Sequence, residues 1–263
     1  MPGHAKVTSS MCAIASYSAI DRGIDCGLLQ ASFNNDPLIN QFFSNVDSEV
    51  AAYLSNNGVD SLMRNVKSGA VTEESIRGCT FSFVNGKLNV FAGTNSGSKS
   101  VFENDMLPLL SACMKSMDST FGMSFVDAPA GVNPLASEAI RNADLIVVCL
   151  PQNYNVLDYL FQNYKMPKGK VFYLFGDYDS GQVCNVRNFV RKYRDKVTAS
   201  SVGCIPHSTE YADALNTGKL ISFYYRNAKC QKNDSNYEFF SSVSDTVEKL
   251  TRFAKGVSTG GKL

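Results

Sequence analysis

The chain has 263 residues, of which 44% are hydrophobic and 19% are charged, and its formal net charge is +1. This length accommodates one large α/β domain with a substantial core. The near-neutral charge excludes a general electrostatic attraction to nucleic acid or acidic membranes. No apolar run approaches the ~20 residues of a membrane helix, so we expect a cytoplasmic protein without a membrane span.

In the first half of the chain, short apolar runs alternate with stretches of helical periodicity. Gly23 closes the first predicted helix, Thr72 is a predicted N-cap, and Pro108 predicts an irregularity inside the last helix. The strands are CGLLQ at 26–30, and FSFVNG and KLNVFAG on either side of a tight Asn85-Gly86 turn. The predicted helices cover residues 9–21, 37–45, 47–56, 59–68, 72–77 and 101–118.

The second half continues the alternation. Predicted strands cover 122–126, 144–150, 170–175 and 200–205, and predicted helices cover 134–142, 153–165, 183–195, 209–216 and 237–255. Strands that alternate with helices favour a doubly wound, mostly parallel sheet with helices on both faces. We therefore predict a single α/β domain over 1–255, followed by a disordered tail at 256–263.

The spacing of the cysteines and histidines indicates whether disulfides or a zinc site are expected. The chain contains eight cysteines without a C-x-x-C pair, and several lie inside apolar runs such as LIVVCLP. This pattern is typical of reduced core thiols in a cytoplasmic protein. His4 and His207 lie far apart in the sequence and lack the flanking ligand pattern of a zinc site.

The segment F-V-D-A-P-A-G, residues 125–131, carries the first functional signal. Asp127 lies at the end of an apolar predicted strand, at the carboxyl edge of the sheet, where doubly wound folds bind ligands. Asp127 is suited to hold Mg²⁺ through its water shell, and Gly131 to offer a backbone N–H to a phosphate. The alternative is an aspartate that caps the following helix.

The neighbours of this segment extend the signal. VDAPAGVNPLASEAIRNADLIVVCLP is similar to the switch region and following strand of the MinD/ParA family of P-loop ATPases, with the pattern D-x-P-x-G, an apolar helix, A-D and a buried strand ending in Pro. LNVFAGT and VGCIPHSTEYADALNTGKLI resemble two further strands of the family with their loops. The resemblance covers nearly the whole chain. It implies ATP and Mg²⁺ as cofactors and a homodimer that sandwiches the nucleotides.

The chain start, MPGHAKVTSS, stands where the family has its phosphate loop, K-G-G-x-G-K-[ST]. In one register Lys6 is the phosphate lysine, and Val7 replaces the Mg²⁺-binding hydroxyl. In the other, His4 takes the signature position, and Ser9 and Ser10 take the K-[ST] pair. Both registers lose glycines that let backbone N–H groups approach phosphate, so the loop reads as degenerate.

The resemblance nevertheless implies a set of binding residues. Thr8, Ser9 and Ser10 lie at a helix N-terminus that can hold phosphate weakly, with Lys6 beside them, and Ser10 joins Asp127 as a metal-binding candidate. The family recognises adenine from the strand matched by KVFYLF and from the I-P loop, which here present Asp177 and Pro206. For Asp177, a plain turn carboxylate is an equal alternative.

Two departures weaken the case for catalysis. The family's next strand ends in D-x-D, whereas this chain has LLQAS, with Gln30 and Ser32 at the matching positions. Neither side chain is a carboxylate base. The strand that precedes the family's phosphate loop is also missing. We expect a truncated chain start, because the alternative, a gap in the sheet, would expose the edges of neighbouring strands.

Two surface features concern partners. The run VRNFVRKYRDK carries five basic residues, which form either a solvated helix face or a patch for non-specific DNA. The C-terminal stretch LTRFAKGVSTGGKL is short and broken by glycines, so we expect a helix that packs on the core, not one that lies on a membrane.

The expected function is that of a MinD/ParA-like positioning or partitioning protein, one that hydrolyses ATP weakly or not at all. No residue is confidently assigned to catalysis. Two alternatives remain open. One is an active Mg-ATPase switch that dimerises around ATP, and the other is a non-catalytic scaffold or localisation factor of a pilus-assembly type system.

Overall fold

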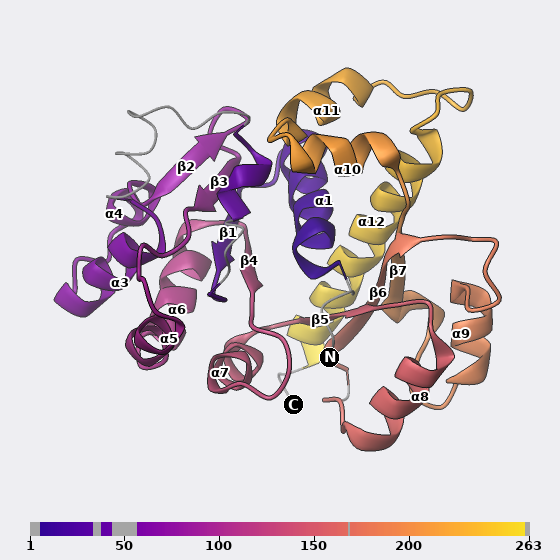
Figure 1. Ribbon diagram of the computed structural model, residues 1–263, viewed down its shortest axis with the longest axis horizontal. Helices are drawn as coiled ribbons and strands as arrows, with labels where there is room; N and C mark the ends of the chain where they lie inside the picture. Colours follow the sequence, from indigo (N-terminus) through magenta and orange to yellow (C-terminus); the bar gives the residue numbers. More distant parts are fainter. Residues whose placement is uncertain (1–5, 34–37, 44–56, 168, 261–263) are drawn as a thin grey trace. The chain divides into compact units, whose positions relative to one another are not determined.

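The computed structural model describes residues 6–33, 38–43, 57–167 and 169–260 (Figure 1). The chain divides into two compact units. Unit 1 contains Ala15–Asn142 and Glu210–Ala228, and unit 2 contains Pro2–Ile14, Ala143–Thr209 and Lys229–Leu263. The predicted helix at 47–56 lies outside the described residues.

Unit 1 holds a four-stranded sheet with the order β2-β3-β1-β4. β1 is parallel to β3 and β4, whereas β2 is antiparallel to β3, as expected for the Asn85-Gly86 hairpin. Asn85 and Gly86 both have positive φ, the conformation that this turn chemistry favours. The strands are β1 (Cys26–Gln30), β2 (Thr80–Phe83), β3 (Leu88–Phe91) and β4 (Met123–Asp127).

Helices of unit 1 mostly follow the local signals. The described residues confirm the bounds 59–68 and 134–142, and Thr72 forms a capping box with Ser75 at the start of α4. The single helix predicted over 101–118 is wrong, because the chain breaks around Pro108, which has no N–H to continue a helix. The helices are α3 (Val59–Ser68), α4 (Glu73–Arg77), α5 (Lys99–Met106), α6 (Leu110–Thr120), α7 (Pro134–Asn142) and α11 (Leu220–Asn227), with a 3-10 turn η1 (Leu38–Gln41) inside the predicted 37–45 helix.

Unit 2 holds a three-stranded sheet in which β6 lies between β5 and β7 and is parallel to both. The first three residues of β5 are partly exposed, so this strand is less buried than its apolar sequence predicts. β5 is an edge strand of its sheet, which accounts for the exposure. The elements are β5 (Ile146–Leu150), β6 (Val171–Tyr178), β7 (Val202–Pro206), α8 (Tyr154–Asn163), α9 (Val186–Lys192), a 3-10 turn η2 (Ala199–Ser201) and α12 (Tyr237–Gly260).

Helix α12 packs along β7 through one close approach. A Cβ on Gly203 would lie 2.6 Å from Thr246 Cγ2 and 3.1 Å from Phe172 Cε1. The Thr246 hydroxyl accepts from the Cys204 N–H at 3.0 Å and donates to the Cys204 carbonyl at 2.9 Å. The helix ends at Gly260, beyond residue 255, where the sequence pattern predicts its end.

Two helices lie at the boundaries of the units along the chain, α1 (Val7–Ile20) and α10 (Thr209–Asn216). Residues 11–19 of α1 are all buried, and Gly23 follows with φ 63°, in agreement with its predicted role at the helix end. No described helix is long and apolar enough to cross a membrane. The mostly parallel α/β architecture is confirmed.

Candidate functional site

Asp127 is the last residue of β4 and is 5% exposed. It pairs in register with Gln30, the last residue of β1, and its carbonyl accepts from the Ala31 N–H at 2.9 Å. Registered neighbours in a sheet direct their side chains to the same face. A buried carboxylate and a buried carboxamide (3% exposed) therefore lie side by side at the carboxyl edge of unit 1.

The orientation of the Gln30 amide is determined by its neighbour. Gln30 Oε1 accepts a hydrogen bond from the Leu38 backbone N–H at 2.9 Å. Because that N–H can only donate, the atom facing it must be the amide oxygen. Gln30 Nε2 is buried and has no hydrogen-bond partner among the described residues. From the sequence, Gln30 is a lost carboxylate or at most a residue that orients a water, and its buried donor is not apparent.

The loop after β4 leads to α7. Gly131 is exposed and has φ 82°, a left-handed conformation that glycine adopts without strain. Asn133 Oδ1 accepts from the Leu135 N–H at 2.8 Å at the start of α7. Asn133 therefore caps the first turn of α7, so this helix does not need Asp127 as its cap.

The predicted phosphate-binding residues form the first turn of α1, and Lys6 to Ser10 belong to unit 2. Lys6 has φ 51°, a strained conformation for a side-chain-bearing residue and the one that loop glycines supply. The Lys6 carbonyl accepts from the Ser10 N–H at 2.9 Å and from the Ser9 hydroxyl at 3.1 Å. Thr8 is partly buried in the same turn.

Ser10 provides a test of whether a phosphate or metal ligand fits this turn. Ser10 is 1% exposed, and its hydroxyl has no hydrogen-bond partner among the described residues. A buried hydroxyl without a partner costs about 1–3 kcal/mol. A hydroxyl oxygen can coordinate Mg²⁺, and a hydroxyl O–H can donate to a phosphate oxygen, so Ser10 fits the magnesium nucleotide that the resemblance implies.

The other nucleotide-binding candidates lie at the ends of β6 and β7 in unit 2. Asp177 has φ 55°, which marks backbone strain of the kind found at functional sites. Its carboxylate lies 2.7 Å from His207 Nδ1, and both side chains are exposed. Pro206 is buried and pairs with Tyr178. The structure thus joins Asp177 to His207, a contact that the sequence did not reveal.

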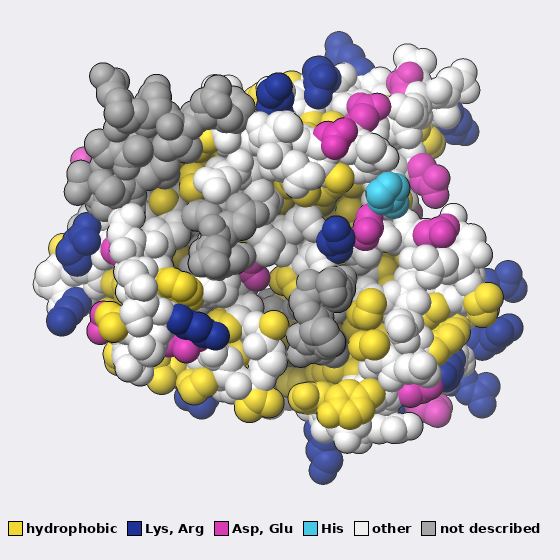
Figure 2. Space-filling model, in the orientation of Figure 1, with side chains coloured by type: hydrophobic (Ala, Val, Ile, Leu, Met, Phe, Trp, Pro, Cys, Tyr) yellow, Lys and Arg dark blue, Asp and Glu magenta, His cyan; other side chains and the backbone are white. Residues whose placement is uncertain are grey.

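The five basic residues of the run at 187–196 divide into two groups. Lys192 contacts Asp158 at 2.7 Å, and Lys196 donates to the Phe161 carbonyl at 2.8 Å, so both lysines act within unit 2. Hydrogen bonds from Lys192 and from Tyr193 lower the pKa of Asp158. Figure 2 shows Lys and Arg side chains gathered over α9. The remaining members of the run are exposed and have no ion pair among the described residues: Arg187, Arg191 and Arg194.

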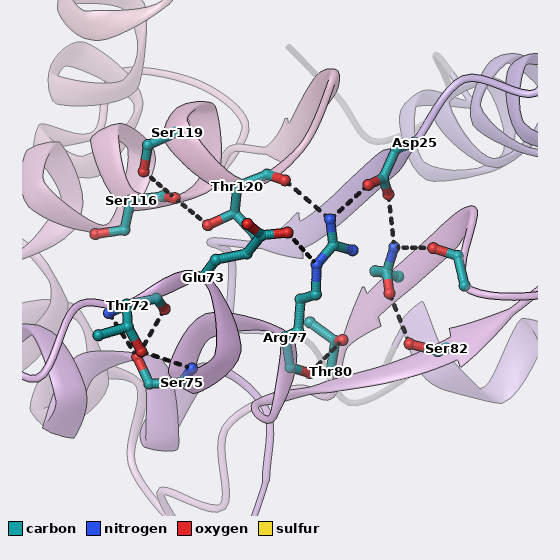
Figure 3. Close-up of polar contacts among 12 residues, drawn as sticks. Asp25, Thr72, Glu73, Ser75, Arg77, Thr80, Ser82, Ser116, Ser119 and Thr120 are labelled. Atoms are coloured by element: carbon teal, nitrogen blue, oxygen red, sulfur yellow. Dashed lines mark hydrogen bonds and ion pairs between the residues drawn. The ribbon is translucent and has the colours of Figure 1, made fainter.

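The amino end of β1 carries a different network (Figure 3). Arg77 reaches from α4 to Asp25 at 2.6 Å and also donates to the Thr120 carbonyl at 3.1 Å. Asn89 Nδ2 donates to the other oxygen of Asp25 at 3.0 Å. These side chains satisfy one another, so this end of the strand is structural. At the carboxyl end, by contrast, Gln30 Nε2 has no hydrogen-bond partner in the described segments.

Comparison with solved structures identifies the fold. No protein-family model matches the sequence, and no curated protein matches it. A ParA family ATPase from Chlorobium tepidum TLS matches with a TM-score of 0.68 over 94% of this chain and 95% of that chain, at 11% identity. The Pyrococcus furiosus cell division ATPase MinD matches with a TM-score of 0.64 over 95% of each chain, at 14% identity.

A third solved structure is the septum site-determining protein MinD from Pyrococcus horikoshii OT3, complexed with Mg-ADP. It matches with a TM-score of 0.58 over 96% of this chain and 94% of that chain, at 12% identity. All three matches span nearly the full length of both chains. The chain therefore has the MinD/ParA-like P-loop NTPase fold.

Proposed function

We propose that this chain is a nucleotide-dependent positioning or partitioning protein that binds Mg-ATP and hydrolyses it weakly or not at all. One observation carries the proposal. The carboxyl edge of β1 and β4 keeps a buried carboxylate, Asp127, beside a carboxamide, Gln30. A carboxylate can hold a metal ion, whereas a carboxamide cannot accept a proton at neutral pH as a general base must.

Each candidate residue has a role in this proposal. Asp127 would hold Mg²⁺ through water, and Ser10 would either offer its hydroxyl oxygen to the metal or donate its O–H to a phosphate oxygen. Two further groups contribute to binding. The phosphate-binding set is Lys6, Thr8, Ser9 and the backbone N–H of Gly131, and the base-binding set is Asp177 and Pro206. When bound, Mg²⁺ neutralises charge on the phosphates.

The comparisons support the nucleotide in general terms, because the Pyrococcus horikoshii protein is complexed with Mg-ADP. Two features of the chain itself also support it: the strained Lys6, and the Ser10 hydroxyl, which has no hydrogen-bond partner within the described part of the chain. A ligand at this turn would supply the partner that the buried hydroxyl lacks. We further propose a homodimer that forms around the nucleotide. Size-exclusion chromatography with and without a non-hydrolysable Mg-ATP analogue tests it, and an unchanged elution volume would refute it.

Calorimetry combined with phosphate release tests the binding proposal. We expect wild-type protein to bind Mg-ATP and to release phosphate either slowly, over few turnovers, or no faster than a protein-free blank. Asp127→Ala should weaken binding at least about tenfold, since it removes the buried carboxylate that is proposed to hold Mg²⁺. Asp118→Ala is the matched control, because Asp118 is an exposed aspartate on α6. It should bind as wild type does.

The alternatives give different results in the same experiment. Rapid, multiple-turnover phosphate release that disappears in Asp127→Ala would establish an active ATPase switch and overturn the proposal of weak or absent hydrolysis. Absence of any binding heat with Mg-ATP and with Mg-ADP, supported by an unchanged melting temperature, would favour a non-catalytic scaffold and overturn nucleotide binding.

A further inference from the structure

Of the two polar atoms of the Gln30 side chain, only the oxygen has a hydrogen-bond partner among the described residues. Its amide oxygen accepts from the Leu38 N–H at 2.9 Å, which turns Nε2 away from Leu38. Gln30 is 3% exposed, and Nε2 has no hydrogen-bond partner among the described residues. A buried amide donor without a partner is costly, and native structures seldom keep one unless a ligand or water completes it.

The neighbour of this donor restricts what the missing partner can be. Gln30 pairs in register with Asp127, so the two side chains project from the same face of the sheet. Nε2 can only donate, so its partner is an acceptor atom. An anionic acceptor beside the Asp127 carboxylate is repelled unless a cation lies between them. A phosphate oxygen that shares a divalent cation with Asp127 meets both conditions.

We propose that Gln30 is a ligand-binding residue, whose amide Nε2–H donates a hydrogen bond to a phosphate oxygen of a metal-bound nucleotide held at Asp127. This inference rests on the proposed nucleotide binding and goes beyond it. Gln30 then acts as a clamp that retains the nucleotide. It does not orient a water for hydrolysis, because its only acceptor atom is already engaged by Leu38.

Two variants distinguish the loss of the Nε2–H donor from damage to the fold. Gln30→Glu keeps an oxygen for the Leu38 N–H but replaces the donor with a negatively charged acceptor. Gln30→Met removes both polar atoms at similar size. The control is Gln162→Glu, the same chemical change on an exposed glutamine of α8. Calorimetry measures the affinity for Mg-ATP, and electron paramagnetic resonance measures the affinity for Mn²⁺ alone.

Loss of a hydrogen bond to a charged oxygen should weaken Mg-ATP binding about tenfold to a hundredfold in both Gln30 variants and leave the control unchanged. In Gln30→Glu the affinity for Mn²⁺ alone should stay equal or rise, since the added charge favours the cation. A merely structural role for Gln30 would lower both affinities together, and that result would overturn the proposal.

The remaining outcomes are also distinguishable. If wild-type protein binds Mg-ATP and Gln30→Glu binds it equally well, the clamp is refuted while the proposed function stands. If wild-type protein binds no Mg-ATP, the proposed function fails and the clamp fails with it. Circular dichroism of each variant without nucleotide checks that the fold is intact before affinities are compared.

Discussion

Replacement of Arg77 by methionine should destabilise unit 1 without affecting nucleotide binding. Arg77 donates to Asp25 at 2.6 Å, to the Thr120 carbonyl at 3.1 Å and to Glu73 at 3.0 Å (Figure 3). Methionine retains most of the aliphatic length but none of these donors. The loss also leaves Asp25, which is only 22% exposed, with the Asn89 amide and without its cation.

The magnitude follows from the exposure of each contact. The bond to Asp25 is charge-assisted and partly buried, so it contributes about 1.5–3 kcal/mol. The bond to the Thr120 carbonyl adds about 0.5–1 kcal/mol. Glu73 is 66% exposed, and the pair with it adds about 0.3–0.5 kcal/mol. Arg77→Met should therefore lower the free energy of unfolding by about 2–4.5 kcal/mol.

Urea denaturation followed by circular dichroism measures this change, because the chain contains no tryptophan for a fluorescence assay. A double-mutant cycle with Asp25→Asn should give a coupling energy of about 1–2 kcal/mol. Arg141→Met is the control. Its contact with Glu138 has the same 2.6 Å length, but Arg141 is 72% exposed, so the change should stay within about 0.5 kcal/mol.

An unfolding free energy of Arg77→Met within about 0.5 kcal/mol of wild type, or additive effects of the Arg77 and Asp25 changes, would contradict this prediction. It also fails if Arg77→Met weakens Mg-ATP binding in protein that remains folded. That result would mean that the Arg77 network at the amino end of β1 contributes to nucleotide binding at the carboxyl end.

Three further predictions concern other parts of the chain. Gly203→Val should lower the melting temperature by several degrees, by a clash with Thr246, whereas wild-type stability would show that α12 can move away. Burial raises the pKa of Cys26 and of Cys113 to about 12, above the unfolded thiol values. The contribution of these two protonated thiols to the free energy of unfolding is therefore complete below about pH 8.5, the unfolded pKa, and is lost as pH rises toward 12. The free energy of unfolding should therefore decrease between pH 9 and pH 11, and a constant value would contradict this. Changing the exposed arginines of the 187–196 run to glutamate should abolish any shift of random duplex DNA in a gel, and retained binding would exclude them as a DNA patch. These are Arg187, Arg191 and Arg194.

Local signals predicted much of the secondary structure. The strand at 26–30 and the helix at 59–68 have the predicted bounds, since an apolar run and flanking glycines are properties of a few neighbouring residues. Thr72 caps α4 as its sequence predicts. The missed helix α11 also carried a local signal, because its buried residues Leu220, Phe223 and Tyr224 have helical spacing.

The break in the helix predicted over 101–118 shows where local signals become insufficient. Pro108 predicted an irregularity, but it did not predict two separate helices. The second helix packs Leu110, Cys113 and Met117 into the core of unit 1, and this burial stabilises it as a separate element after Pro108. Such contacts depend on residues far along the chain, which a short window of sequence does not contain.

For the candidate site, the sequence by itself determined which chemical groups are present: a carboxylate at the end of one strand, a carboxamide at the end of another, and hydroxyls at a helix start. Only the tertiary structure decided what these groups can do. The register that places Gln30 beside Asp127 and the hydrogen bond from Leu38 both arise when separate segments pack together. The orientation of a buried amide depends on that packing, so the free donor that motivates the clamp cannot be inferred from the letters LLQAS.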